Sequence, residues 1–474
     1  MKKNEIYEGI ITAYGSEGEG IIKTDGYVIF VPFSVLNEKI RYRVLKVDKN
    51  IVYAKVESIL APSEKRRVPG CPVFGKCGGC RLLHMDYAEQ LDYKRTLIAH
   101  TLKKIAFLDI AVGETVPSVP ELRYRNKLQL PLRHVNGRNV CGFFAPDSHR
   151  IVETDDCLIQ GDWCAGVIKA IKEFAEIYNL DFYDESADNG LIRHLIVKKV
   201  CEWFLVSVVI NGSNLPHSAE LFELLKKHLY TQSITLTLNE NRSRGNAVLG
   251  EKTRVLFGSG VIKGEQFGVK YTVGTHDFIQ INDSVKQSLY SDAVGFACEN
   301  SPSLVIDAYC GGGLMTALLA AKAKKVIGVE IVREAVDNAE KLIKDNDILN
   351  ATFICGLSEI VLPDIVKQAD GDCTVVLDPP RKGVDKRLIE ALLSSNVKKI
   401  VYVSCNPATL SRDAGLLCGT LHYEGEKLLK SQRTADGQST ENTCGGNYFK
   451  IKSLKGYDMF ADCKGVECLC VFER

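Results

Sequence analysis

The pattern of apolar and polar positions divides the chain into three stretches. In the first, up to about residue 58, short β-rich runs such as 27–31 and 51–56 alternate with turns rich in Gly, Asp and Asn. Short strands separated by such turns favour an all-β unit. We expect residues 1–58 to form a five-stranded Greek-key barrel of the OB type. A linker around Ala61-Pro62-Ser63 should follow.

The second stretch, residues 59–290, has a mixed pattern. Apolar residues recur at helical spacing from about Tyr87 to Ala106, which predicts a helix. The runs 127–133 and 203–210 are typical of strands. We therefore expect an α+β domain over 59–290.

In the third stretch, residues 291–474, strands and helices alternate regularly. Helices are predicted over 313–322 and 332–345, and strands over 304–307, 325–330, 352–355, 373–377 and 399–403. This alternation is typical of a doubly wound, mostly parallel, Rossmann-like sheet. The polar, Gly-rich segment 421–456 interrupts the pattern, and we expect a long loop or insertion there. A last strand is predicted over 468–472.

Two of these predicted strands are followed by residues that can carry chemistry. Cys405 comes just after the strand that begins at Lys399, and Asp378 directly follows the strand 373–377. Ligands of α/β sheets bind at the carboxyl ends of strands. Cys405 is therefore a candidate nucleophile, with an inert buried thiol as the alternative, since free cysteine is among the most buried residue types.

Three glycines, Gly311 to Gly313, lie between a predicted strand and a predicted helix. Glycine lets the backbone approach a ligand closely. Glu330 ends the following strand, where a carboxylate can accept both ribose hydroxyls of an adenosine-containing cofactor. The longer glycine motif of dinucleotide sites is missing, so S-adenosylmethionine fits better than NAD. The alternative is that a tight strand-to-helix turn needs glycine in any case.

The cysteines give a separate signal. Of 17 cysteines, Cys71, Cys77 and Cys80 fall within ten residues on a Gly-rich segment, which indicates metal binding. We expect the fourth ligand to be Cys157 rather than Cys141 or Cys164. Four thiolates suit structural zinc or an iron–sulfur cluster. The wide gap between Cys71 and Cys77 favours iron–sulfur, and three unligated thiols are the alternative.

Composition limits the classes of function only loosely. The formal net charge is +1, so there is no overall basic field, and the basic run within 37–67 is a weak sign of nucleic-acid binding. No apolar run approaches the roughly 18 residues needed to span a bilayer. The amino terminus lacks the apolar core of a signal peptide. We expect a cytoplasmic protein that does not contact membranes.

Three motifs together resemble one family. The segments 378–383, 404–410 and 278–282 are similar to the motifs of S-adenosylmethionine-dependent RNA uracil-C5 methyltransferases, and the likeness covers essentially the whole chain. The resemblance implies a multidomain protein: a TRAM domain at the amino terminus, a central domain with a [4Fe-4S] cluster, and a class I methyltransferase domain.

The resemblance also implies roles for individual residues. Cys405 would be the nucleophile that adds to C6 of uracil, and Glu467 the base that removes the C5 proton. The positions that contact the cofactor in the family correspond to Gln280, Tyr309, Glu330 and Asp378. The ligands of its cluster correspond to Cys71, Cys77, Cys80 and Cys157.

The chain departs from the family pattern near the base. Ala461 and Gly465 stand where the family has proline and histidine, and Glu467 follows Cys405 by 62 residues, more than is usual. Glu441, inside the 421–456 segment, is the alternative base.

The leading hypothesis from the sequence is a monomeric enzyme that methylates C5 of a uridine in 23S ribosomal RNA. The barrel and the four cysteines resemble the ribosomal branch of the family, whereas the transfer-RNA branch generally lacks both. The same reaction on transfer RNA is the second hypothesis. The third is an RNA-binding or assembly factor with impaired catalysis, against which the intact Cys405 argues.

Overall fold

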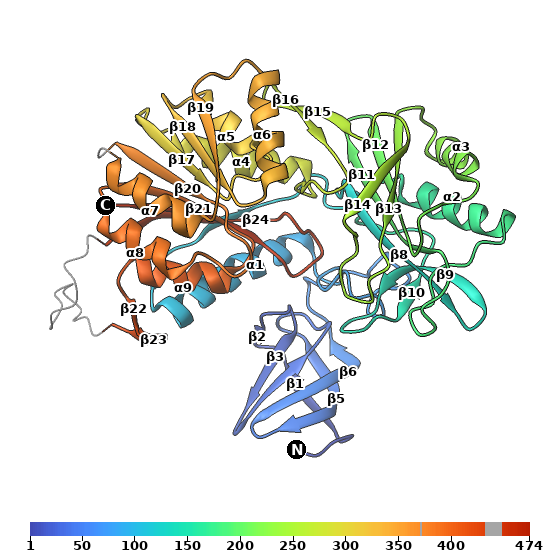
Figure 1. Cartoon of the computed structure of the whole chain (residues 1–474). Coiled ribbons are helices and arrows are strands. Elements are labelled where there is room, and N and C mark those ends of the chain that lie inside the picture. The colour runs from blue at the N-terminus through green and yellow to red at the C-terminus, as the bar shows by residue number, and fades with distance from the viewer. Residues whose placement is uncertain (370–371, 432–447) are drawn as a thin grey trace.

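The computed structural model describes residues 1–369, 372–431 and 448–474. Three β-sheets of six, seven and eight strands form the body of the molecule. The six-stranded sheet is set apart from the other two, which lie side by side with the hairpin β15–β16 between them (Figure 1).

The six-stranded sheet takes in the amino-terminal stretch. Its strand order is β1-β5-β6-β4-β3-β2. The strands are β1 (Ile6–Ile10), β2 (Ala13–Tyr14), β3 (Gly20–Thr24), β4 (Tyr27–Val31), β5 (Lys39–Asp48) and β6 (Ile51–Ala61). Apolar residues such as Ile29, Tyr42 and Val52 form its own core. The sheet has six strands rather than the five predicted, since the two-residue β2 is added, and within residues 1–61 no pairing joins its edge strands β1 and β2. That this unit is a closed barrel of the TRAM type stays a prediction.

The seven-stranded sheet has the order β10-β9-β8-β11-β12-β13-β14. Its strands are β8 (Lys127–Val135), β9 (Arg138–Phe144), β10 (Ile151–Glu153), β11 (Ile192–Val200), β12 (Trp203–Ile210), β13 (Ile234–Glu240) and β14 (Lys252–Phe257). All neighbours pair antiparallel except β12 and β13, which are connected through a helix. The helices α2 (Cys164–Ile177) and α3 (Ser218–Leu229) share one apolar core with this sheet. The hairpin β15 (Ile262–Gln266) and β16 (Val269–Val273) follows.

The eight-stranded sheet has the order β19-β18-β17-β20-β21-β25-β24-β7. Its strands are β7 (Gly113–Val116), β17 (Leu304–Ala308), β18 (Val326–Glu330), β19 (Ala351–Cys355), β20 (Cys373–Leu377), β21 (Lys399–Ser404), β24 (Lys450–Tyr457) and β25 (Glu467–Glu473). The five strands from β19 to β21 are parallel, and β25 runs antiparallel to β21. The predicted Rossmann-like alternation is confirmed.

Helices cover both faces of this sheet, because successive residues of a buried strand point to opposite sides. Ile400 and Tyr402 pack on one face, and Val401 and Val403 on the other. The first face carries α1 (Tyr87–Thr101) with its π-helical last turn Leu102–Ala106, α7 (Ser358–Gln368), α8 (Lys386–Ser394) and α9 (Pro407–Leu417). The second face carries α4 (Asp283–Ala297), α5 (Leu314–Ala320) and α6 (Arg333–Asp345).

Two expectations about chain organisation need correction. Helix α1 and strand β7 fall in the predicted middle stretch, yet α1 packs on the eight-stranded sheet and β7 extends it beside β24. The predicted boundary at 290 cuts through helix α4. A single stretch of sequence therefore serves two sheets, which periodicity alone could not reveal.

The segment 421–456 is also not simply a loop. Residues on its amino-terminal side form the hairpin β22 (Leu421–Glu424) and β23 (Lys427–Lys430), and β24 begins at Lys450 inside the sheet. Glu441, the alternative base, lies outside the described residues.

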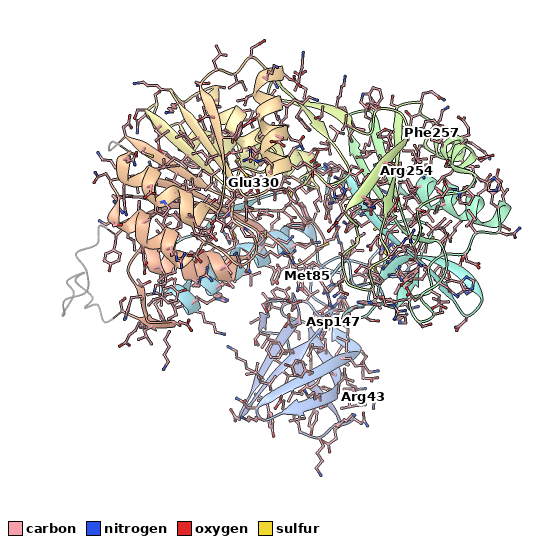
Figure 2. All side chains as sticks on the ribbon, in the orientation of Figure 1. Arg43, Met85, Asp147, Arg254, Phe257 and Glu330 are labelled. Atoms are coloured by element: carbon pink, nitrogen blue, oxygen red, sulfur yellow. The ribbon has the colours of Figure 1, made fainter. Side chains whose placement is uncertain are left out.

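A small apolar cluster joins the six-stranded sheet to helix α1. Met85, labelled in Figure 2 at the junction, is buried together with Val35, Leu82 and Tyr93. Separately, no helix among the described residues is long and apolar enough to cross a membrane.

Candidate active site

Strand pairing brings Cys405 and Glu467 to the same level of the sheet. In the antiparallel pair β21–β25, Ser404 lies opposite Cys468. The next residue along one strand and the preceding residue along the other are Cys405 and Glu467. The Glu467 carboxylate is among the groups that raise the pKa of Cys405, after desolvation by burial. The structure thus brings the predicted nucleophile and base together.

The ionisation of Glu467 is strongly perturbed. Only 5% of the residue is accessible. Desolvation, with a smaller contribution from Asp378, raises the pKa of Glu467 to about 8, against a contribution from Arg381 that lowers it. Burial in a low-dielectric setting disfavours the charged form. A carboxyl group with such a pKa can both hold and accept a proton near neutral pH.

Asp378 and Arg381 lie in the loop that follows β20. Desolvation raises the pKa of Asp378 to about 7. The residue is also exposed and lines the cavity, and this exposure acts in the opposite direction by favouring the ionised form. Arg381 is hydrogen-bonded to Cys405 and lowers its pKa, opposing the burial effect. A guanidinium beside a thiol favours the thiolate, which is the reactive form.

A buried carboxylate fixes this loop to helix α9. Asp413 Oδ2 accepts hydrogen bonds from the backbone N–H of Val384 at 2.8 Å and from the Tyr402 hydroxyl at 2.7 Å. Gly383 has φ +80°, and a Cβ there would lie 2.6 Å from Asp413 Oδ2. Asn406 caps α9 through Ala408 and also donates to the Arg381 carbonyl at 3.2 Å. The two motifs that flank the catalytic pair are therefore held as one unit.

The glycine turn and Glu330 are directly bonded. Glu330 Oε2 accepts from the backbone N–H of Gly311 at 3.1 Å, and Oε1 accepts from Val332 at 2.9 Å. A carboxylate oxygen has two lone pairs, so each oxygen keeps capacity for one ribose hydroxyl. Gly313 has φ +80°, and a Cβ there would lie 2.6 Å from that of Ala339. The turn needs glycine for packing as well as for any ligand.

A cavity of about 860 Å³ opens at this edge, between the eight-stranded sheet and the β15–β16 hairpin. The four predicted cofactor-contacting residues, Gln280, Tyr309, Glu330 and Asp378, all line it. Glu330 is labelled in Figure 2 on the side of the sheet that faces the seven-stranded sheet. Cys405 and Glu467 lie beside the cavity rather than in its wall, and are linked to it electrostatically through Asp378.

Sequence reasoning missed two residues of this cavity. Asp307 is buried at the end of β17, where Thr316 donates to it at 2.5 Å and desolvation raises its pKa to about 7. Tyr290 of α4 is hydrogen-bonded to Gln280, and the charges of Asp307 and Asp378 help to raise the pKa of its hydroxyl. The position of Asp307 directly before the glycine turn was a usable signal. Nothing in the pattern of α4 singled out Tyr290.

The predicted metal ligands lie near one another but do not enclose an ion. Cys71 is close enough to Cys77 to raise the pKa of Cys77, and Cys157 acts in the same way on the pKa of Cys80. All four are half-buried and free. Yet within residues 1–369, 372–431 and 448–474 no three His, Cys, Asp or Glu side chains are placed to hold a metal ion. The four thiols are the donor type of a cluster, and their placement is not that of a single-ion site.

A fifth thiol lies at this place. Cys463 is hydrogen-bonded to Cys80 and receives a hydrogen bond from Arg125 at 3.6 Å. It belongs to the segment that leads to Glu467, so the cysteine-rich loop touches the segment that carries the predicted base. Its place inside the base motif was the signal that sequence reasoning left unused.

Comparison with known proteins identifies the class and then the family. The model of the tRNA (uracil-5-)-methyltransferase family matches residues 86–428. A protein of Clostridium tetani named as an uncharacterized RNA methyltransferase is 38% identical over 434 residues, 91% of this chain and 93% of its own. One from Clostridium acetobutylicum is 37% identical, over 90% of this chain and 93% of its own. The fold and these matches define an RNA methyltransferase that uses S-adenosylmethionine. Since the family model covers well over half of the chain, the chain belongs to the tRNA (uracil-5-)-methyltransferase family.

A solved structure supports the fold over the whole length. It is Pyrococcus abyssi tRNA (uracil-54, C5)-methyltransferase in complex with S-adenosyl-L-homocysteine, with a TM-score of 0.74 and 24% sequence identity. The match covers 98% of this chain and 100% of that one. The family resemblance drawn from the sequence is confirmed, and the protein is an RNA uracil-5 methyltransferase.

Proposed function

We propose that the protein methylates C5 of a uridine in 23S ribosomal RNA, with Cys405 as the nucleophile and Glu467 as the base. The observation that supports the catalytic pair is the β21–β25 register, in which Cys405 and Glu467 flank the paired residues Ser404 and Cys468. The choice of ribosomal RNA rests on the family resemblance. Gln280, Tyr309, Glu330 and Asp378, which line the cavity, would hold the cofactor. When bound, S-adenosylmethionine would supply the methyl group and leave as S-adenosyl-L-homocysteine.

The residues of the chain account for the bonds made and broken on the uracil. The Cys405 thiolate, favoured by Arg381, adds to C6 of the uracil, and the electron pair moves to C5, which takes the methyl group. Ionised Glu467 then accepts the C5 proton, the C6–S bond breaks, and Cys405 leaves as thiolate. The target base must leave its stack to reach Cys405. A pKa of about 8 makes Glu467 a stronger base than an ordinary carboxylate.

Radiolabelled cofactor and unmodified RNA test the catalytic pair. Cys405→Ala should abolish label transfer to uracil, and Glu467→Gln should accumulate a covalent RNA–protein adduct on denaturing gels. Cys355→Ala is the matched control, because Cys355 also ends a parallel strand of this sheet, and its activity should be unchanged. A Cys405→Ala variant that still transfers label contradicts the nucleophile. Normal turnover by Glu467→Gln shifts the base to Glu441, and an inactive parent favours an RNA-binding or assembly factor.

Transfer RNA is the second candidate substrate. The structure of Pyrococcus abyssi tRNA (uracil-54, C5)-methyltransferase matches nearly the full length of this chain. The presence of an amino-terminal sheet therefore does not by itself favour ribosomal RNA. The same assay with both RNAs side by side decides: label on transfer RNA alone would overturn the ribosomal proposal while leaving the chemistry intact.

We also propose, from the family resemblance, that Cys71, Cys77, Cys80 and Cys157 hold a [4Fe-4S] cluster. Its support is the four free thiols on two neighbouring loops. No catalytic step above depends on it. Anaerobically purified protein should contain about four irons and absorb in the iron–sulfur band, and Cys157→Ser should lower both. Colourless, iron-free protein would contradict the proposal. Monomeric state and cytoplasmic location stay predictions.

A further inference from the structure

The cavity has a lining that extends beyond the cofactor-contacting residues. Its volume, about 860 Å³, lies toward the upper end of the range of about 300–1,000 Å³ for small-molecule sites. Besides the edge of the eight-stranded sheet, β12, β15 and β16 wall it. We call this second side the hairpin wall; its residues used below are Trp203, Lys263, Lys270 and Tyr271.

Trp203 is the prominent side chain of this wall. It is the first residue of β12 and pairs with Val200 across the turn formed by Cys201 and Glu202. A large aromatic residue is usually well buried, yet Trp203 is 43% exposed and lines the cavity. The other tryptophan, Trp163, is 8% exposed and packs edge-on against Phe204. The two tryptophans of the chain therefore have opposite environments.

The hairpin beside Trp203 is packed tightly enough to form a fixed surface. A Cβ on Gly264 would lie 2.4 Å from the Val200 side chain and 2.6 Å from the Tyr271 ring. The absent side chain lets β15 lie directly against the β11–β12 turn. An aromatic ring on such a frame is a preorganised stacking surface, since little further ordering is needed on binding.

Charge differs between the two sides of the cavity. The sheet edge contributes the carboxylates Asp307, Glu330 and Asp378, which suit a cationic sulfonium. The hairpin wall contributes Lys263 and Lys270, both exposed, with Glu265 as the acid between them. Neither lysine forms an ion pair with any residue that the structure describes. Proteins commonly bind single-stranded nucleic acid in this way, with positive side chains near the phosphates and an exposed aromatic ring stacked on a base.

We propose that the hairpin wall binds the nucleotide next to the target uridine, with its base stacked on Trp203 and its phosphate near Lys263. This inference rests on the proposed function, since an RNA strand that delivers a flipped uracil to Cys405 must pass the cavity beside which Cys405 lies. An extruded base leaves its neighbours partly unstacked. Trp203 would replace the lost stacking, and because every base has a π-face the contact tolerates any sequence.

The two tryptophans make a direct optical test possible. Trp163→Phe leaves Trp203 as the sole tryptophan. With selective excitation of tryptophan, a short single-stranded RNA with a central uridine should quench its emission on titration. Trp203→Phe, which leaves only the buried Trp163, should show no quenching. If Trp163→Phe does not fold, the difference between parent and Trp203→Phe gives the same signal.

Binding measurements separate stacking on Trp203 from general effects. Trp203→Ala should weaken binding of that RNA by roughly 5- to 150-fold, the range for one stacked base, and leave S-adenosylmethionine binding unchanged. Trp203→Phe should recover most of the loss. RNA with abasic nucleotides on both sides of the uridine should bind parent and Trp203→Ala equally. Tyr230→Ala, at a residue 93% exposed outside the cavity wall, is the control.

Two results would overturn the proposal. One is that substitution of Trp203 leaves RNA affinity unchanged and RNA does not quench Trp203 emission, while the parent methylates the same RNA. The other is a Trp203→Ala variant that loses S-adenosylmethionine affinity as much as RNA affinity, which would assign the wall to the cofactor. A parent that methylates no RNA would instead refute the proposed function, so the two failures are distinguishable.

Discussion

The buried carboxyl of Glu467 should make stability depend on pH in a defined direction. Its pKa rises from an ordinary 4.5 to about 8 in the folded protein. Folded protein therefore keeps the proton up to about pH 8, whereas unfolded chain releases it near pH 4.5. The stability that the neutral acid contributes is fully present below pH 4.5 and is lost as pH rises to 8.

The magnitude follows from the size of the shift. Moving from 4.5 to about 8 is roughly 3.5 units, and at about 1.4 kcal/mol per unit the total loss is about 5 kcal/mol. Roughly 2 kcal/mol of this is lost by pH 6 and the rest by pH 9. Gln cannot ionise, so the Glu467→Gln variant does not lose this stability. The free energy of unfolding of the variant minus that of the parent should therefore be about 3 kcal/mol larger at pH 9 than at pH 6.

Urea titrations followed by circular dichroism at pH 6 and pH 9 measure this difference. The comparison of variant with parent cancels titrations common to both, apart from Asp378, whose charge acts on Glu467, and Cys405, whose pKa Glu467 raises. Glu176→Gln, at an exposed position on α2, should show no pH-dependent gap. A gap for Glu467→Gln that stays constant between the two pH values, or shrinks, would refute the reasoning.

Three further perturbations test the site and its support. In a single turnover, conversion of the covalent adduct to free methylated RNA should speed up with pH and level off above about pH 8, as Glu467 ionises to accept the C5 proton; a flat profile would contradict its role. Lys94→Met should destabilise the fold by about 3–5 kcal/mol in thermal or urea unfolding, since it leaves buried Asp458 unpaired, and adding Asp458→Leu should restore part of that. Gly383→Ala should weaken S-adenosylmethionine binding in calorimetry, because its positive φ and contact with Asp413 force the loop to shift; unchanged binding would argue against rigid coupling.

Periodicity predicted the eight-stranded sheet well because its parallel strands are buried on both faces. Such strands appear as uninterrupted apolar runs, and β20 and β21 are buried along their whole length. The assignments that failed involve long-range pairing. Nothing in Gly113–Val116 indicates that it pairs with β24, more than 300 residues later, because a four-residue edge strand has too few positions to carry a pattern.

The same limit applies to the site. Strand ends predicted Cys405, Asp378 and Glu330, since position along a parallel strand fixes which edge a residue reaches. Glu467 came only from the resemblance. Its strand runs antiparallel, so it is the amino-terminal end of β25 that meets the carboxyl end of β21. A rule based on parallel strands cannot reach that residue.

The altered base motif is held by contacts that do not need the missing proline and histidine. Within the segment that precedes Glu467, Lys94 of α1 pairs with buried Asp458 and also donates to the Phe460 carbonyl at 3.0 Å. The Ala461 carbonyl accepts from the Tyr124 hydroxyl at 3.0 Å.

The second half of the segment is fixed from the other side. The Asp462 carbonyl accepts from the backbone N–H groups of Arg81 and Leu82 at 3.0 and 2.9 Å, in the loop that carries Cys80. Cys463 is hydrogen-bonded to Cys80 itself. Backbone and side-chain bonds from α1 and from the cysteine-rich loop thus set the path of the chain into β25. The position of Glu467 therefore rests on the pairing of β25 with β21 and β24 and on these bonds to the preceding segment, none of which uses a proline side chain at 461 or a histidine side chain at 465.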